Sequence, residues 1–433
     1  MMIPNVKKDL PVFQEIIKTA TFLVRKASPV ITSNIVTSIL AAVSNFMFLS
    51  LISARTFGQF KYFQAFLPLL AIFSAQGISI ALEQDFARKK YGEFGKAVAM
   101  QIRFSLAGIT LLFATGAYFY HLRNFNQCAA AVLAAVLYIP YFVFPTAYSC
   151  YSGKKMFSSV GFFFSLRALL QHTTVIALIL LTRSENALLY IAAILVVPSI
   201  FNTAVYVITV RKKEFFTNTE TGGAVGYGLK ISLGSVLCES LAEVDKLLLK
   251  HFGGYQEVAI YSAAQIIIRL VKIFQKNIAS VIRIMFCSFD SLQENWQKIR
   301  LRVAVLYLLS IASALIVNLL YPLVGKLLFP ESYRESLIIS QIMLFAYISF
   351  GQGSMIFPGI LLVHKKMKEY LIFSNLCTFL RTGLMLIFVP MFLSYGVVCS
   401  SIIFFLCTPF IGVYLIHKAI RQESSLETIN KNP

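Results

Sequence analysis

Basic side chains recur at helical spacing within one apolar stretch of the chain. Arg269, Lys272, Lys276 and Arg283 lie at positions i, i+3, i+7 and i+14, within about 60° of one another around a helix. Cations are costly against lipid, so this face should border a water-filled cavity, where it can bind an anion. For Lys276 and Arg283 the alternative is that they reach back to the cytoplasmic membrane surface.

The preceding apolar stretch has a matching polar face. Its members are spaced three or four residues apart: Ser232, Ser235, Glu239, Glu243, Lys246 and Lys250. Two consecutive helices that each present one polar face indicate a cavity between them. We expect Glu239, Glu243 and Asp245, with Lys246 and Glu83, to form ion pairs that hold basic side chains in place or to couple an ion gradient.

Other stretches contribute fewer polar groups. Asn34 and Asn45 share a face of the first one, and Arg167 and Arg381 lie deep in two later ones. Hydrogen bonds between helices explain the amides as well as a substrate path does. They explain the two arginines less well, and the apolar stretches hold few acids for structural ion pairs. The candidate anion contacts are therefore Arg269, Lys272, Lys276, Arg283, Arg167, Arg381, Asn34 and Asn45.

The elements that carry these residues are predicted to be membrane-spanning helices. The chain of 433 residues is 58% hydrophobic and only 13% charged, whereas about a quarter of a soluble domain is charged. A bilayer core requires about 20 apolar residues per helix. Twelve segments meet this requirement, the seventh and eighth most weakly: 29–53, 62–83, 97–121, 127–149, 157–182, 187–210, 229–250, 257–283, 302–322, 336–363, 371–393 and 395–417.

The net charge of +20 is distributed in a way that predicts orientation. One set of alternate loops holds roughly three times as many Lys and Arg residues as the other, which places both termini in the cytoplasm. Within residues 9–27 the apolar side chains fall on one helical face, which predicts an amphipathic helix lying on the membrane surface. The alternative is a flexible tail. The expected parts are a cytoplasmic segment 1–28, an N-lobe 29–210, a linker 211–228, a C-lobe 229–417 and a cytoplasmic tail 418–433.

Several classes of function are disfavoured by what the sequence lacks. The predicted external loops are too short for a catalytic domain, and there is no Walker A pattern. Seven cysteines are scattered without a CxxC pair, and five histidines are dispersed, so no metal site or cofactor is expected. The basic residues have almost no soluble surface from which to bind nucleic acid.

The chain also resembles itself and a known family. Residues 57-FGQFKYFQAF-66 and 258-VAIYSAAQII-267 form a weak repeat, which fits six helices followed by six. The segment 241-LAEVDKLLLKHFGGYQEVAIYSAAQI-266 resembles the signature of Wzx-type flippases for lipid-linked oligosaccharides, in the multidrug/oligosaccharidyl-lipid/polysaccharide (MOP) exporter superfamily; 55-RTFGQFKYF-63 echoes it. Ala259 departs from the glycine expected there.

The resemblance implies an all-α polytopic membrane protein with two six-helix lobes around a central cavity. Its implied activity is not enzymatic: it moves an undecaprenyl-diphosphate-linked oligosaccharide between leaflets of the bacterial inner membrane, for O-antigen, capsule or exopolysaccharide. Implied partners are that substrate, membrane lipid, a polysaccharide polymerase and a chain-length regulator. The alternatives are a cation-coupled multidrug exporter of the same superfamily, which so basic a cavity disfavours, and a membrane enzyme acting on lipid-linked sugars.

Overall fold

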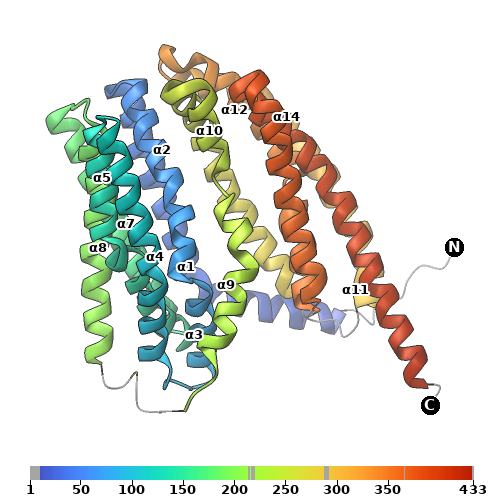
Figure 1. The fold of residues 1–433 in the computed structure, drawn as a ribbon. Coiled ribbons are helices and arrows are strands. Elements are labelled where there is room, and N and C mark those ends of the chain that lie inside the picture. The colour runs from blue at the N-terminus through green and yellow to red at the C-terminus, as the bar shows by residue number, and fades with distance from the viewer. Residues whose placement is uncertain (1–9, 213–214, 216–219, 287–291, 365, 432–433) are drawn as a thin grey trace.

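Long helices running side by side build the molecule (Figure 1). The computed structural model describes residues 10–212, 215, 220–286, 292–364 and 366–431. The first half contains α1 (Leu10–Leu51), α2 (Ala54–Ala71), α3 (Gly77–Ala87), α4 (Phe94–His121), α5 (Phe125–Val136), α6 (Ala147–Gly153), α7 (Phe157–Thr182) and α8 (Ala187–Arg211). The second contains α9 (Ala224–Ser240), α10 (Val244–Phe286), α11 (Leu292–Leu328), α12 (Arg334–Phe350), α13 (Gly353–Val363) and α14 (Met367–Lys431).

The apolar helices are long enough to span a bilayer. Among the described residues, seven helices have the length and composition to cross a membrane, and nine do so if each of two pairs bent by 59° counts as one span. The bent pairs are α2 with α3, and α5 with the segment 139–153. A multi-pass membrane protein is thereby confirmed. Ten of the twelve predicted spans fall within these helices and bent pairs, and the other two are 229–250 and 257–283.

Two of the long helices contain a break where a loop was predicted. Within α14, Leu393 has non-helical dihedral angles and separates the stretches predicted as the last two spans. Within α10, Gly254 has a φ of 79°, which glycine tolerates best, and it separates the predicted seventh and eighth spans. Neither α9 nor α10 is among the helices apolar enough to cross a membrane, in agreement with their weak hydropathy in the sequence.

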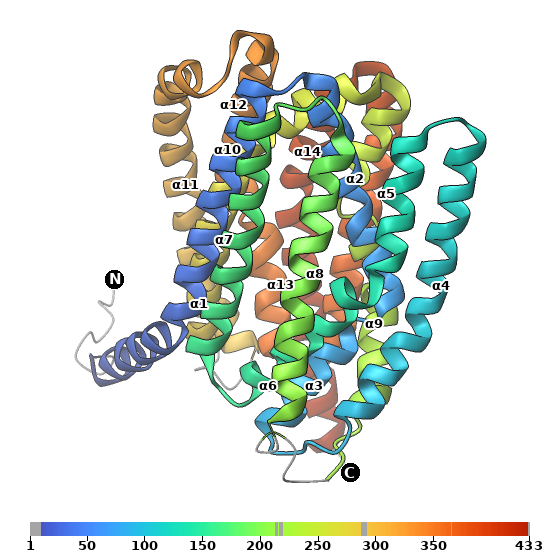
Figure 2. The same cartoon turned by 90° about the vertical axis from the view of Figure 1, so that its left-hand side faces the viewer.

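The first helix joins two predicted parts of the chain. The stretch expected to lie on the membrane surface and the first predicted span form one helix, α1, with Pro29 inside it. Figure 2 shows the first part of α1 running out from the bundle at an angle, as expected when a proline removes a helical hydrogen bond. The start of α1 and the end of α14 lie at the same end of the bundle (Figure 1).

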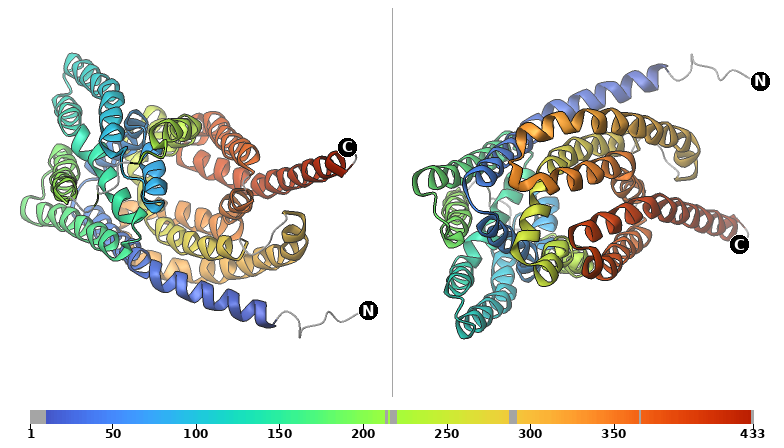
Figure 3. Two further views of the ribbon diagram at one scale, coloured as in Figure 1. Left: turned by 90° about the horizontal axis from the view of Figure 1, so that it is seen from below. Right: turned by 90° about the horizontal axis from the view of Figure 1, so that it is seen from above.

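The halves form two groups of helices that are distinct when viewed along the bundle (Figure 3). We refer to them as the N-lobe (α1–α8) and the C-lobe (α9–α14). They contact each other chiefly through α2 with α10, α1 with α10, and α3 with α9. A large buried cluster that includes Phe48, Phe57, Tyr190, Tyr261 and Tyr347 draws side chains from both lobes.

Glycines permit two of these lobe contacts to be very close. A Cβ atom at Gly58 of α2 would overlap the carbonyl oxygen of Tyr255 in α10. At the other contact, a Cβ atom at Gly77 of α3 would overlap the backbone of α9 at Gly228. The Gly77 N–H also donates a hydrogen bond of 2.9 Å to the hydroxyl of Ser232. Backbone therefore touches backbone at both places.

A carboxylate from another loop caps the start of α2. Glu185 lies between α7 and α8 and accepts hydrogen bonds from the hydroxyls of Ser53 and Thr56, the latter at 2.7 Å. It also accepts the Ser53 N–H at 3.1 Å. These bonds satisfy groups that a helix N-terminus leaves without partners, and they fix the position at which α2 enters the bundle.

Candidate functional site

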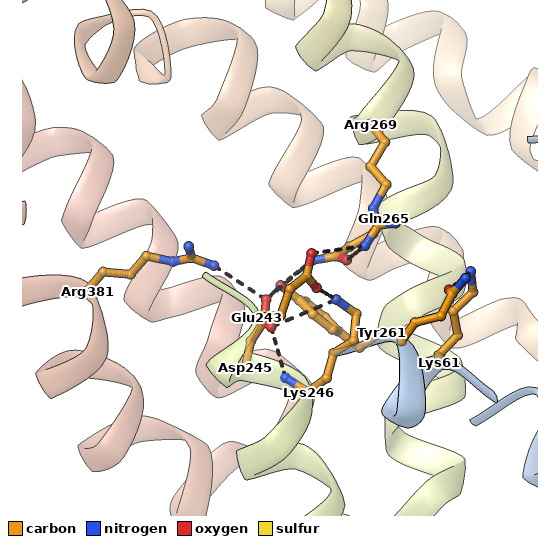
Figure 4. A network of polar contacts seen from close by, with 9 residues as sticks. Lys61, Glu243, Asp245, Lys246, Tyr261, Gln265, Arg269 and Arg381 are labelled. Atoms are coloured by element: carbon orange, nitrogen blue, oxygen red, sulfur yellow. Dashed lines mark hydrogen bonds and ion pairs between the residues drawn. The ribbon is translucent and has the colours of Figure 1, made fainter. Parts of the chain in front are cut away.

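Asp245 lies at the centre of a buried polar network where the two lobes meet (Figure 4). Its side chain is 1% exposed. The carboxylate accepts hydrogen bonds from the Tyr261 hydroxyl at 2.7 Å, from the Gln265 amide at 3.4 Å and from the Arg381 guanidinium at 3.4 Å. Gln265 also donates to the Tyr261 hydroxyl at 2.7 Å. A carboxylate so deeply buried requires partners of this kind, since an unpaired buried charge is very costly.

A break in the helix puts Asp245 in this position, and it corrects one expectation. The segment 229–250 was predicted to be one continuous span, but α9 ends at Ser240 and α10 begins at Val244, with a turn between them. The Asp245 side chain accepts the backbone N–H of Lys246 at 2.9 Å, at the start of α10, where N–H groups lack helical partners. The predicted polar face of this segment therefore does not continue unbroken.

Lys246 and Glu243 form an ion pair in the same network. Lys246 is 1% exposed, and its ammonium nitrogen lies 4.0 Å from Asp245 as well. On the other side of Glu243, Arg269 donates to its carboxylate at 3.4 Å and to the Gln265 amide oxygen at 3.3 Å. The structure thus brings Glu243, Asp245, Lys246, Arg269 and Arg381 together.

A cavity of about 530 Å³ opens between the lobes next to this network. We call it the lobe cavity. Three cations and one carboxylate line it: Lys61, Lys246, Arg269 and Glu243. Lys61 comes from α2 in the N-lobe, and the other three come from the C-lobe. Its volume lies within the range of about 300–1,000 Å³ typical of ligand pockets.

Lys61 was missed by the sequence analysis. Its ammonium group was counted with an external loop, but α2 starts at Ala54, so Lys61 lies two turns inside the helix and is only 4% exposed. It donates to the Gln64 side-chain oxygen at 2.9 Å and lies over the rings of Phe57 and Phe60. No carboxylate pairs with it among the described residues. The signal in the sequence that could have indicated its burial is its position among the aromatic residues of 57-FGQFKYFQAF-66.

A second cavity of about 430 Å³ lies inside the C-lobe, and we call it the C-lobe cavity. All of its lining residues belong to α9, α10, α12, α13 and α14 or to the turn between α9 and α10. Lys272 and Arg381 supply positive charge, and Tyr261, Tyr347 and Tyr370 supply aromatic rings. Only Ala242 lines both cavities.

The remaining candidate residues lie elsewhere. Arg167 is half-buried in the N-lobe, within electrostatic reach of Tyr141 and Tyr148, and lines neither cavity. Asn34 and Asn45 lie on α1, and Glu83 is exposed on α3; none of the three lines either cavity. The side chains of Glu239, Lys276 and Arg283 lie outside the described residues.

The network and its two cavities carry an excess of positive charge. Lys246 lies within electrostatic range of Lys61, Lys272, Arg269 and Arg381. Glu243 and Asp245 pair with Lys246, Arg269 and Arg381. Such a site can hold a polyvalent anion, because the anion would replace water around cations that the protein itself leaves partly uncompensated.

The amino-acid sequence matches the profile of a known family. Residues 23–283 match the family described as polysaccharide biosynthesis protein. A search among curated proteins gives no significant match.

The fold matches solved transporter structures over most of their length. A MOP superfamily transporter from Pyrococcus furiosus, whose report describes a binding pocket of reversed polarity, has a TM-score of 0.66 at 14% identity, covering 92% of this chain and 96% of that one. The Vibrio cholerae MATE transporter VcmN, solved as a mutant, has a TM-score of 0.58 at 14% identity, covering 94% and 98%. At such identities the likeness establishes the fold, which is the all-helical fold of MOP and MATE proteins.

Proposed function

The chain belongs to the polysaccharide biosynthesis protein family, and from that premise we propose that it translocates an undecaprenyl-diphosphate-linked oligosaccharide across the bacterial inner membrane. The direction proposed is from the cytoplasmic to the periplasmic leaflet, with both termini in the cytoplasm. Family and fold together support transport rather than enzymatic catalysis. The translocated oligosaccharide would enter the assembly of O-antigen, capsule or exopolysaccharide.

The observation that carries the proposal is the lobe cavity with Lys61 on one side and Arg269 on the other. These two cations belong to different lobes and interact electrostatically. Without an anion they repel each other and disfavour close approach of the lobes. A diphosphate between them would convert this repulsion into attraction, since each ammonium or guanidinium group can form charge-assisted hydrogen bonds with phosphate oxygens.

This arrangement suggests how the head group could cross the hydrocarbon core. The diphosphate would leave water for a cavity whose cations offset its desolvation, while the isoprenoid tail stays in the bilayer. Binding would favour the conformation in which the lobes lie closest, so a rocking motion of one lobe against the other could then expose the cavity to the opposite side. Lys246, paired with Glu243, adds charge without being free to move.

Export of organic cations is the function that the fold alone would also allow. Three cations and one carboxylate line the lobe cavity, so a cationic drug would meet net repulsion there. We therefore do not propose it.

The test is transbilayer movement of substrate by the purified full chain in liposomes. Fluorescent undecaprenyl-diphosphate-linked disaccharide is placed in both leaflets, and a membrane-impermeant reductant reports how much becomes accessible from outside. We expect Lys61→Gln to slow the movement at least tenfold, because one charge-assisted contact to the anion, worth about 1.5–3 kcal/mol, is lost.

Matched variants make this result interpretable. Lys61→Arg keeps the charge and should retain most of the activity, and Lys326→Gln, at the far end of α11, should behave as the unchanged protein. Movement at the normal rate by the well-folded double variant Lys61→Gln/Arg269→Gln would contradict the proposal. So would a protein that moves an organic cation but not the lipid-linked sugar.

A further inference from the structure

We propose that the C-lobe cavity is a separate subsite for the glycan, built to bind a sugar that carries a carboxylate. This inference rests on the proposed function, because it assigns the sugar end of the same substrate. It concerns a different cavity from the one assigned to the diphosphate, so the two assignments can fail independently.

The lining of the C-lobe cavity has the chemistry of a carbohydrate site. Tyr370 presents a partly exposed aromatic ring, on which the C–H face of a pyranose can pack, whereas Tyr261 and Tyr347 line the cavity but are 0% and 4% exposed. Hydroxyl groups that can both donate and accept hydrogen bonds come from Ser374, Thr378, Thr382 and Ser401. The described lining of the lobe cavity contains neither tyrosine nor hydroxyl side chains, so it offers a sugar much less.

The charge of the C-lobe cavity selects among sugars. Among the residues that the structure describes, its lining includes two cations, Lys272 and Arg381, and no carboxylate. Arg381 donates to Asp245 at 3.4 Å, but Lys272 has no ion pair with a described residue and lies 5.1 Å from the centre of the Tyr347 ring. A neutral sugar would leave this positive charge uncompensated, whereas a carboxylated sugar would pair with it.

The polar network lies between the two cavities. This arrangement matches a ligand whose diphosphate lies in one cavity and whose glycan lies in the other. Glu243, Lys246 and Arg269 face the lobe cavity, and Tyr261, Lys272 and Arg381 face the C-lobe cavity. Figure 4 shows the network between Lys61 on one side and Arg381 on the other. A diphosphate held in the lobe cavity would therefore point its glycan past Gln265, which lines the C-lobe cavity and bonds to Arg269.

The experiment measures binding of soluble glycans to the full chain in lipid nanodiscs. The probes are a disaccharide containing glucuronic acid and its matched glucose disaccharide, each without lipid or phosphate, with affinity read by saturation-transfer NMR. We expect the acidic disaccharide to bind about tenfold more tightly, since one charge-assisted hydrogen bond is worth at least that factor. Lys272→Gln should remove this preference, and Lys61→Gln should leave it intact.

A second arm separates this inference from the proposed function. Undecaprenyl diphosphate without sugar should lose affinity in Lys61→Gln and keep it in Lys272→Gln. Equal affinity for the two disaccharides would overturn the subsite, and so would an acid preference lost in Lys61→Gln but kept in Lys272→Gln. If undecaprenyl diphosphate does not bind at all, the proposed function fails, while the disaccharide arm still decides the subsite. Thr378→Val, which keeps both cations, should weaken both disaccharides alike.

Discussion

Two buried lysines face the lobe cavity from opposite lobes, and the protein surrounds them differently. Lys246 in the C-lobe is 1% exposed, pairs with Glu243 and lies beside Asp245. Lys61 in the N-lobe is 4% exposed, donates to an uncharged amide and lies over two phenylalanine rings. Among the residues that the structure describes, carboxylates balance the charge of Lys246, and none pairs with Lys61.

The difference assigns them different roles. A compensated ion pair holds the start of α10 in place and changes little when a ligand arrives. An uncompensated buried ammonium group carries a desolvation cost that an anionic ligand can relieve. The N-lobe thus contributes the responsive charge, and the C-lobe contributes a fixed scaffold around Asp245. Five substitutions test this distinction.

The largest effect is expected for Asp245→Asn. The substitution removes the carboxylate charge beside Arg381 and the buried Lys246. Because Lys246 keeps Glu243 and Arg381 is 30% exposed, the free energy of unfolding should fall by about 3 kcal/mol, the lower end of the range for breaking a buried ion pair. Denaturant titration in detergent micelles, followed by tryptophan fluorescence or circular dichroism, measures it. The control is Glu331→Gln at an exposed position. Equal stability of the two variants would mean that Asp245 does not stabilise the fold.

Tyr261→Phe should have the next largest effect. Its hydroxyl donates to Asp245 at 2.7 Å, and a hydrogen bond to a charged group contributes about 1.5–3 kcal/mol. The same titration should show a loss in that range, and Tyr227→Phe, an exposed tyrosine at the start of α9, should show none. A loss shared by both variants would point to a general effect of removing a hydroxyl.

Lys61→Met tests the role of the lysine whose charge has no carboxylate partner among the described residues. Replacing a buried charge that has no carboxylate partner in the described part of the chain by an apolar side chain of similar length should raise the free energy of unfolding by about 1 kcal/mol, although substrate movement is lost. Lys246→Met should instead lower it, because Glu243 loses its partner. Thermal unfolding of the two variants side by side gives the signs. Destabilisation by both would remove the distinction between the lysines.

The smallest effect concerns the Glu185 cap, which fixes the entry of α2 and so the place of Lys61. Partial burial favours a higher pKa for Glu185, but the hydrogen bonds from Ser53 and Thr56 prevail and its pKa is lowered from 4.5. A lowered carboxyl pKa contributes stability that is present at neutral pH and is lost as the pH falls through the folded-state value. Glu185→Gln should therefore weaken the acid dependence of the unfolding temperature measured between pH 7 and pH 3.

The all-helical fold could be predicted from the sequence because apolar length and residue spacing, which determine the helices, are local features. Apolar length and spacing gave the helices, and the glycine at position 254 lies in the loop predicted between spans. The same spacing rules grouped Arg269 and Lys272, which lie one turn apart on a continuous part of α10. The approach of Glu243 to Lys246 needed no more than their separation of three residues.

The arrangement of the candidate site could not be predicted, because it depends on features that residue spacing does not report. Asp245 became the centre of the network because the chain breaks between Ser240 and Val244, which shifts every later residue around the axis. Lys61 was placed outside because a single charge near a loop looks the same whether it is buried or exposed. Arg167 lies apart from both cavities because lobe packing, which sequence periodicity does not report, decides which helix faces which.

The glycine contacts at Gly58 and Gly77 have a mechanical consequence. At Gly58 the two backbones meet without a side chain of α2 between them. Parting α3 from α9 at Gly77 also breaks the hydrogen bond from the Gly77 N–H to the Ser232 hydroxyl. The 59° bend between α2 and α3 places the two contacts on segments that point in different directions, so one can separate while the other persists. In the proposed transport cycle, these two contacts would be the pivots about which the lobes move.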